Sequence, residues 1–382
     1  AITFLKKIEN LDYLDAVKTL AQRAGLQMPQ EGFDDSLSKR RRRILEMNRE
    51  AARFYHSVLL SPEGKVGYDY YIGRALSAAT INHFGLGFAP NQWDALLKHM
   101  RAKGYQPAEL VDAGLARKGQ KGYYDNFRNR VMTPIIDVRG NVIAFGGRVL
   151  DDSKPKYINT GDTLVYKKTN ELFALNFAKD SKEDALILCE GYMDVIAMHQ
   201  AGFTNAVAGC GTALTTEQVR LISRYAKEVI LTYDADEAGQ KALQKAMTLF
   251  DQTDVKVRIP ALVGGKDPDE IIRTYGRDKF KGMLEGASNE TEFRLLALRR
   301  QYNLATTQGK ILATLPPVEQ DLYVSRLSEE LGVERQNMKV QLQDLVARQG
   351  NRREKREFNR IVQENMRKTA RETMATDASL RK

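Results

Sequence analysis

Acidic residues stand directly after two hydrophobic runs in the middle of the chain. Glu190 follows the run 185–189, and Asp234 and Asp236 follow the run 229–233. Both runs are short and apolar, which is typical of buried strands. Helical stretches and two further strand-like runs accompany them, at 192–200, 205–208, 216–224, 237–250 and 255–259. This alternation predicts an α/β fold with a parallel sheet and right-handed crossovers. Ligands bind beyond the carboxyl ends of such strands, which is where the three acids fall.

A second acidic group, Asp267 and Asp269, follows the last predicted strand. Mg²⁺ takes oxygen ligands, keeps much of its water, and is usually held by a few carboxylates together with substrate phosphates. Two such ions can clamp the attacking and leaving oxygens of a phosphoryl displacement. A single acid would be better explained as a solvated loop residue or a helix cap, and Asp236 with Glu237 would suit a helix N-terminus. Three acidic clusters at the same end of successive parallel strands favour a metal site.

These acidic segments resemble a known signature. Residues 190–194, 233–239 and 267–269 are similar to the Toprim motifs of primases, topoisomerases and certain nucleases. Their setting resembles the catalytic core of bacterial replicative primases of the DnaG type, and the resemblance extends to about residue 345. The upstream and intervening segments that fit this family in order are 126–135, 143–148, 155–159 and 209–215. Two departures are visible, because Thr133 replaces a large apolar residue and Asp125-Asn126 replaces an aromatic and basic pair.

The resemblance implies a function and a set of site residues. The implied reaction is DNA-directed synthesis of RNA primers on single-stranded DNA during replication, in which a 3′-hydroxyl attacks the α-phosphate of a ribonucleoside triphosphate. The implied cofactor is Mg²⁺, for which Mn²⁺ can substitute. The implied metal ligands are Glu190, Asp234, Asp236, Asp267 and Asp269, and the first three are also the predicted catalytic residues. Asp194 lies one turn after Glu190 and is predicted to be a further ligand or to support one.

Two other functions would use the same features. A Toprim topoisomerase or nuclease would need the same acids, but a topoisomerase also needs a nucleophilic tyrosine in a separate domain. No large extra domain is present in the 382 residues. A non-catalytic nucleic-acid-binding scaffold could keep the fold, although the complete acidic set argues against it.

The strongest basic signal lies in residues 117–148, which hold seven Lys and Arg residues against two Asp residues, a net charge of +5. Aromatic residues are interleaved with these cations. Arginine binds phosphate and stacks on bases, so such a segment suits single-stranded nucleic acid. The residues alone are equally consistent with a small β-rich subdomain, in which the rings lie in the core and the arginines on a solvated face. With the resemblance, the predicted template or nucleotide contacts are Arg128, Arg130, Arg148, Lys156 and Lys168.

A second basic run, Lys39 to Arg43, opens a helical stretch that reaches about Leu60. Such a run can be a solvated face, a nucleic-acid contact or a docking surface for another subdomain, and the sequence does not choose among them. The net charge of +10 favours an anionic partner without identifying it. Trp93, the only tryptophan, is predicted to pack in a core.

Cysteine usage and hydropathy limit the class of protein. Cys189 and Cys210 are predicted to be buried thiols without a disulfide framework. The four histidines do not pair with cysteines at zinc-ligand spacing, so no zinc is expected. No apolar stretch of about 18 residues and no signal peptide is visible, so no membrane partner is predicted. We expect a cytoplasmic protein of the bacterial replisome.

Five segments are predicted along the chain. Residues 1–35 resemble the end of the family's zinc module and a linker, and 36–180 form a basic α/β subdomain. The Toprim subdomain occupies 181–284, a helical bundle 285–345, and a polar basic tail or linker 346–382. The start at Ala1 in place of Met indicates a fragment. The resemblance implies that the zinc-binding and helicase-binding modules of the family are missing from it. A replicative helicase and a single-strand-binding protein are expected partners, through absent or C-terminal segments.

Overall fold

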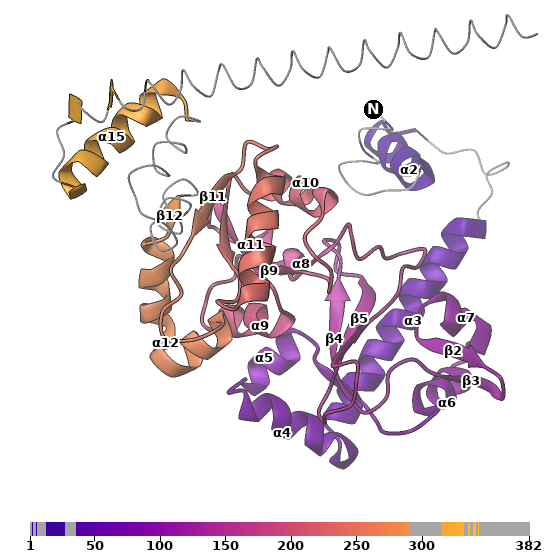
Figure 1. Cartoon of the computed structure of the whole chain (residues 1–382). Helices are drawn as coiled ribbons and strands as arrows, with labels where there is room; N and C mark the ends of the chain where they lie inside the picture. The colour runs from indigo at the N-terminus through magenta and orange to yellow at the C-terminus, as the bar shows by residue number, and fades with distance from the viewer. Residues whose placement is uncertain are drawn as a thin grey trace, which may run out of the picture. The chain divides into compact units, whose positions relative to one another are not determined.

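A long helix and a four-stranded antiparallel sheet form the first part of the protein (Figure 1). Helix α3 (Ser36–Leu59) buries Ile44, Met47, Ala51 and Tyr55, whose spacing of three and four residues places them on one face. The chain approaches this helix closely at Gly87, where an added Cβ would lie 2.6 Å from the Cβ of Tyr55. The strands follow the order β1 (Gly87–Ala89), β4 (Arg130–Ile136), β5 (Val142–Val149) and β6 (Tyr157–Asn159).

Short helices and a hairpin surround this sheet. The hairpin pairs β2 (Ala116–Gly119) with β3 (Gly122–Asp125). The helices are α4 (Lys65–Gly73), α5 (Ala78–His83), α6 (Ala95–Ala102) and α7 (Pro107–Asp112), with a 3₁₀ turn at Pro62–Gly64. Aromatic rings of α3 and the sheet meet in the core, where Tyr55 packs edge-on against Phe145.

The second sheet has parallel strands at its centre. Strands β10 (Glu228–Thr232), β8 (Ala185–Cys189) and β9 (Ala206–Gly209) are parallel neighbours, and β7 (Leu172–Phe173) joins β9 in antiparallel sense. The helices here are α8 (Leu175–Ala178), α9 (Tyr192–Gln200), α10 (Thr216–Tyr225), α11 (Glu237–Phe250) and α12 (Pro268–Glu285), which is kinked at Gly276. The predicted α/β class with a parallel sheet is therefore confirmed.

This computed structural model describes residues 13–26, 36–289 and 315–331, with positions 2, 5, 293, 335, 336, 339, 340 and 343. The chain divides into two units, one of Ala1–Val255 with Leu262–Gly282 and the other of Lys256–Ala261 with Met283–Lys382. The predicted tail 346–382 and most of the segments 1–35 and 285–345 lie outside the described residues. The predicted helical bundle and the segment boundaries therefore stay predictions.

The remaining described elements are few. Helix α2 (Tyr13–Arg23) belongs to the larger unit. In the smaller unit, β11 (Lys256–Ile259) pairs with β12 (Ser288–Asn289), and α15 (Pro317–Leu331) is the described helix. Cys189 and Cys210 are buried free thiols, as predicted. None of the helices in the described part of the chain has the length and apolar character needed to cross a membrane.

Candidate metal and nucleic-acid site

Glu190 and Asp234 emerge at the same edge of the parallel sheet. Strands β8 and β10 are paired in register from Ala185 with Glu228 to Cys189 with Thr232, so their carboxyl ends coincide. The backbone N–H of Asp234 donates a 3.0 Å hydrogen bond to Oε1 of Glu190. At Gly239, in the first turn of α11, an added Cβ would lie 2.7 Å from the same Oε1. The two acids predicted from separate strands are thus in direct contact.

Asp194 lies in the first turn of α9, buried beneath this edge. Burial and, after it, the charges of Asp267, Asp234 and Asp269 together raise the pKa of Asp194 to about 8. The backbone of Asp269 lies near its carboxylate and favours the charged form, which lowers the pKa of Asp194 and so opposes this rise. These four carboxylates therefore lie within electrostatic reach of one another.

The pKa values of the neighbouring acids are also raised. Burial raises the pKa of Asp234 to about 6, with further contributions from the charges of Glu190, Asp267 and Asp236. Desolvation raises the pKa of Glu190, and the charge of Asp236 adds to this, while the N–H of Asp234 opposes it. Like charges held this close are stabilised by a bound cation, and such clusters mark candidate functional sites.

Asp236 and Asp267 use one oxygen each to cap a helix. Oδ1 of Asp236 accepts from the N–H of Gly239 at 2.8 Å, at the start of α11. Oδ1 of Asp267 accepts from the N–H of Glu270 at 2.8 Å, at the start of α12. The capping role that the sequence left open for Asp236 is thus present. A role of either acid in metal binding stays a prediction.

Asp269 is fully buried, with 0% of its surface exposed. Its Oδ2 forms ion pairs with Arg74 and, at 3.2 Å, with Nε of Arg273. Its Oδ1 has no hydrogen-bond partner among the described residues. A buried carboxylate oxygen without a partner is costly, so this atom is a natural place for a further cation.

The acidic edge, which consists of Glu190, Asp194, Asp234, Asp236, Asp267 and Asp269, fits a magnesium site with few protein ligands. Over residues 36–289 and the other described positions, no three His, Cys, Asp or Glu side chains converge into one ligand set. The available donors are nevertheless all carboxylate oxygens, and Asp269 presents one that lacks a partner. Mg²⁺ commonly takes only one or two protein carboxylates and fills its other positions with water and substrate phosphate.

The raised pKa of Asp194 predicts how the stability of the metal-free protein depends on pH. With a folded-state pKa of about 8 against an ordinary value of 3.8, Asp194 keeps its proton in the folded state after the unfolded chain has lost it. The free energy of unfolding therefore falls as pH rises from about 4 to 8. We expect Asp194→Asn to reduce this fall, with Tm at pH 8 higher than wild type by roughly 3 °C or more. Thermal unfolding in EDTA across this pH range measures the difference in Tm. Parallel curves of Tm against pH for the two proteins would refute the raised pKa of Asp194.

Trp93, Tyr124 and Arg128 form a stack in which Trp93 is exposed and the other two side chains are partly buried. The Trp93 and Tyr124 rings are 4.8 Å apart and nearly parallel, and the Arg128 guanidinium lies 4.4 Å from the centre of the Trp93 ring. Trp93 is 61% exposed, so its predicted role in core packing is wrong. Helix α6 begins only at Ala95, which leaves Trp93 in the preceding loop and outside the buried face of the helix. The position of Trp93 between Pro90 and that helix was the sequence feature that could have indicated a loop residue.

The other predicted contacts differ in how accessible they are. The Arg148 guanidinium lies 4.8 Å from the Tyr70 ring and 5.9 Å from the Tyr157 ring. Lys156 is exposed, and Lys168 is partly buried. All of these remain predictions as contacts to nucleic acid or nucleotide.

Arg130 is the exception, because its guanidinium is turned inward. It is 6% exposed and donates to the carbonyl oxygens of Gly147 at 3.1 Å, Lys156 at 3.2 Å and Pro155 at 3.0 Å. These bonds hold the segment before β6 against β5. Its predicted contact with the template stays a prediction, but these bonds make a structural role the better explanation.

We expect Arg130→Ala to destabilise the fold. The loss should be about 3 kcal/mol in the free energy of unfolding, because three carbonyl oxygens lose a charged donor. Arg128→Ala is the control, since its guanidinium donates to one carbonyl, that of Asp125, and is otherwise stacked on rings. Denaturant unfolding measures both variants. Equal stability of the two would contradict the structural role of Arg130.

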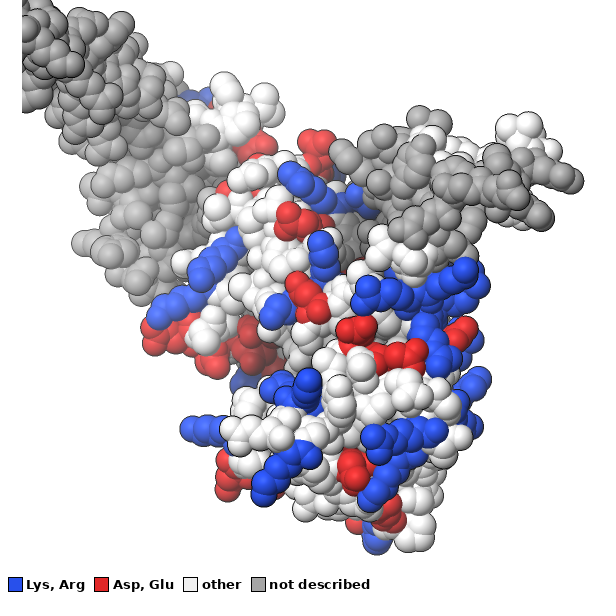
Figure 2. All heavy atoms as spheres, turned by 90° about the vertical axis from the view of Figure 1, so that its right-hand side faces the viewer, with Lys and Arg blue, Asp and Glu red and all other residues white. Residues whose placement is uncertain are grey.

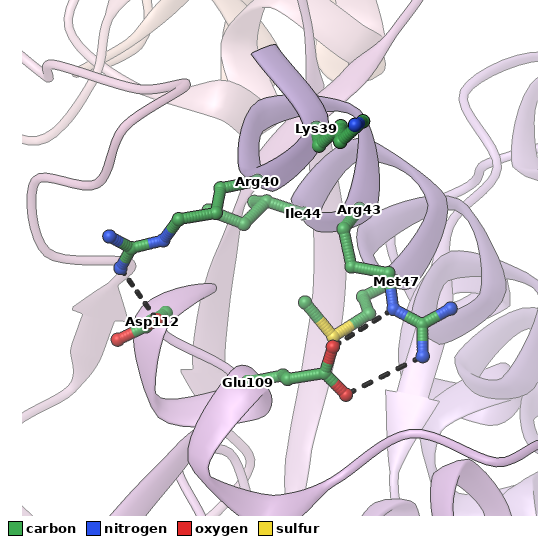
Figure 3. Close-up of a pocket in the computed structure, with 7 residues that line it drawn as sticks. All are labelled: Lys39, Arg40, Arg43, Ile44, Met47, Glu109 and Asp112. Carbon is green, nitrogen blue, oxygen red and sulfur yellow. Dashed lines mark hydrogen bonds and ion pairs between the residues drawn. The ribbon is translucent and has the colours of Figure 1, made fainter. Parts of the chain in front are cut away.

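The basic run at the start of α3 packs against α7 (Figure 3). Arg40 pairs with Asp112 at 3.0 Å, and Arg43 pairs with Glu109 at 3.0 Å. These residues line a pocket of about 300 Å³ together with Lys39, Ile44 and Met47. Two of the five cations therefore pair with acids of the same subdomain, and neither nucleic-acid contact nor docking of another subdomain is tested for this run.

The surrounding face carries charges of both signs. Figure 2 shows Lys and Arg side chains over the side that bears α3, α6 and α7, with Asp and Glu side chains between them. The positive charge visible there is interspersed with acids and does not form one dense patch.

Comparison with known proteins supports the resemblance. Residues 54–179 match the model of the DNA primase catalytic core, N-terminal domain, and residues 187–272 match the Toprim-like model. The Toprim-like domain is a metal-binding fold. The chain is 37% identical over 378 residues to a DNA primase of Clostridium acetobutylicum, covering 96% of this chain and 63% of that protein. It is 40% identical over 326 residues to a DNA primase of Deinococcus radiodurans, covering 84% and 56%. The chain therefore spans about three fifths of the length of these curated relatives.

Solved structures of primase catalytic domains are similar to this chain over nearly their whole length. The RNA polymerase domain of Mycobacterium tuberculosis primase DnaG is 33% identical with a TM-score of 0.69, and the match covers 76% of this chain and 99% of that chain. A DnaG primase catalytic domain bound to single-stranded DNA is 33% identical with a TM-score of 0.66, covering 78% and 99%. At this identity and coverage, with the acidic edge in place, the chain belongs to the family of DnaG-type DNA primase catalytic cores.

Proposed function

We propose that this chain synthesises short RNA primers on single-stranded DNA from ribonucleoside triphosphates. The 3′-oxygen of the growing strand attacks the α-phosphorus, the bond to the bridging oxygen breaks, and pyrophosphate leaves. The observation that carries the proposal is the crowding of Glu190, Asp194 and Asp234 at the carboxyl ends of β8 and β10, with raised pKa values. Membership of the primase family supports the same reaction.

The acidic edge supplies the groups that this reaction needs. The proposed ligands of Mg²⁺, or of Mn²⁺ in its place, are Glu190, Asp234, Asp236, Asp267 and Asp269. When bound, such ions lower the pKa of the attacking hydroxyl and offset charge on the phosphates. Asp194 lies within electrostatic reach of Asp267 and Asp269, so the first turn of α9 faces the start of α12. Glu190 is exposed and has a raised pKa, which suits it to take the proton of the hydroxyl.

The stack of Trp93, Tyr124 and Arg128 supplies a surface for the template. Bases of single-stranded nucleic acid stack on aromatic rings, and an adjacent guanidinium attracts the backbone. Trp93, Tyr124 and Arg128 combine the two kinds of group on one surface. A structural relative is bound to single-stranded DNA, which is consistent with this assignment.

One incubation separates this function from its alternatives. The chain is mixed with single-stranded DNA, labelled ribonucleotides and Mg²⁺ or Mn²⁺, and nicking and relaxation of plasmid DNA are scored in parallel. Short labelled RNA that requires template and metal supports the proposal. Nicking or relaxation without RNA would favour a Toprim nuclease or topoisomerase, and binding without reaction would favour a scaffold. A replicative helicase and a single-strand-binding protein in a bacterial replisome belong to the same proposal.

A further inference from the structure

Arg74 lies at the end of α4 and reaches the acidic edge from the other sheet region of the same unit. Its Nη2 forms an ion pair with Oδ2 of Asp269, although the two residues are 195 positions apart. We propose that Arg74 is a positioning residue for the metal site, holding one oxygen of Asp269 so that the other faces the cation. This inference rests on the proposed function, because it assumes that the acidic edge binds metal.

The hydrogen bonding of Asp269 is asymmetric. Oδ2 is shared by two cations, Arg74 and Arg273, whereas Oδ1 is buried with no partner among the described residues. If the arginines served only to neutralise a buried charge, a bidentate fork that satisfies both oxygens would be the stronger arrangement. The observed arrangement fixes the carboxylate and leaves one oxygen for another ligand.

The main chain that carries Arg74 is hydrogen-bonded to the last turn of α4. The N–H of Arg74 donates to the carbonyl oxygens of Tyr70 and Tyr71 at 3.1 Å, and its Nη1 lies 3.5 Å from the hydroxyl of Tyr70. Ala75 follows with a φ of 60°, a left-handed conformation that a residue other than glycine rarely adopts. A strained residue at this point needs support from its surroundings.

Gln200 provides that support. Its Nε2 donates to the carbonyl of Ala75 at 2.8 Å, and its Oε1 accepts from the N–H of Ser77 at 2.7 Å and from the hydroxyl of Thr80 at 2.8 Å. Gln200 is the last residue of α9, the helix that also carries Asp194. One helix therefore holds both the acidic edge and the turn from which Arg74 extends.

A second reading makes Arg74 a simple counter-ion that competes with the metal. The two interpretations predict opposite changes in cation affinity when Arg74 is replaced. Removing a competing positive charge should tighten cation binding, whereas removing a positioning group should weaken it, because the ligand loses its orientation. Losses of about 10- to 100-fold are typical when the residue that orients a metal ligand is replaced.

The test is the affinity of the whole chain for Mn²⁺, measured by electron paramagnetic resonance of the free ion without nucleotides or DNA. We expect Arg74→Gln to weaken binding by about tenfold, and Arg74→Lys to recover part of the loss. Arg273→Gln should have a smaller effect, since Arg273 is 39% exposed and lies one turn along the same helix. Lys65→Gln removes a charge from the other end of α4 and is the matched control. Unchanged or tighter binding by Arg74→Gln would overturn the proposal.

Two further variants keep the result decisive. Asp234→Asn must weaken Mn²⁺ binding if the acidic edge is the metal site. Wild-type binding by this variant would count against the proposed function rather than against the role of Arg74. Gln200→Ala releases the turn without changing any charge, and we expect it to weaken Mn²⁺ binding by roughly threefold or more, within the range for orienting groups. If Arg74→Gln does not fold, a folded Gln200→Ala protein with wild-type affinity would overturn the positioning role.

Discussion

Replacing Asp234 by Asn is expected to lower primer synthesis by about 10²- to 10³-fold while leaving the affinity for single-stranded DNA nearly unchanged. Asp234 lies in the most crowded part of the acidic edge, where burial and the charge of Glu190 raise its pKa to about 6. Asn has nearly the same shape but cannot supply negative charge to a cation. The template would still bind, because the stack of Trp93 and Arg128 contains none of the acids.

The measurement is a paired assay of RNA synthesis and fluorescence anisotropy with labelled DNA. Glu190→Gln should behave in the same way, because the amide oxygen can still accept from the backbone N–H of Asp234 but carries no negative charge for a cation. Asp184→Asn is the matched control, because Asp184 is exposed and precedes β8 at its amino end, away from the acidic edge. Wild-type synthesis by Asp234→Asn would show that the metal site is assigned wrongly.

Replacing Trp93 by Ala should have the second large effect, on binding of the template. Stacking of a base on an aromatic side chain is worth about 1–3 kcal/mol, so the affinity for single-stranded DNA should fall by roughly 5- to 150-fold. Trp93→Phe should lose less, because a ring remains. Arg128→Ala should weaken binding about equally for all sequences and flatten the salt dependence by roughly 0.7 in the slope of log affinity against log salt.

Trp93 also reports on its own site, because it is the only tryptophan of the chain. Titration with single-stranded DNA should quench its fluorescence in the wild-type protein. Tyr275→Ala is the matched control, since Tyr275 is an exposed ring on α12, in a different element. Full affinity of Trp93→Ala together with an unquenched wild-type signal would remove the stack from the template surface.

Much of the parallel sheet could be predicted from the sequence. The predicted strand 185–189 is β8, and the predicted helices 192–200 and 237–250 are α9 and α11, while β9 and β10 are displaced by one residue. These elements have strong local signals, because short apolar runs alternate with amphipathic stretches of helical length. The acids that follow the strands then had to meet, since the carboxyl ends of parallel strands share one edge.

The roles of the cations could not be predicted in the same way. Arg128 and Arg130 are two positions apart in one basic motif, yet Arg128 stacks on the rings of Trp93 and Tyr124 and Arg130 is buried among backbone carbonyls. Trp93 was misplaced for a related reason, since hydrophobicity predicts burial on average but does not reveal that α6 begins two residues later.

The sequence by itself determined the family, the α/β class and the set of acids, because these follow from motif order and from the local periodicity of hydrophobic residues. Only the tertiary structure decided which side chains are free to act. It brought Arg74 to Asp269 across 195 positions and placed Gln200 against the turn that carries Arg74. The physical reason is that burial and ion pairing are made by residues distant in the chain, so no local pattern encodes which cation faces solvent, substrate or a buried carboxylate.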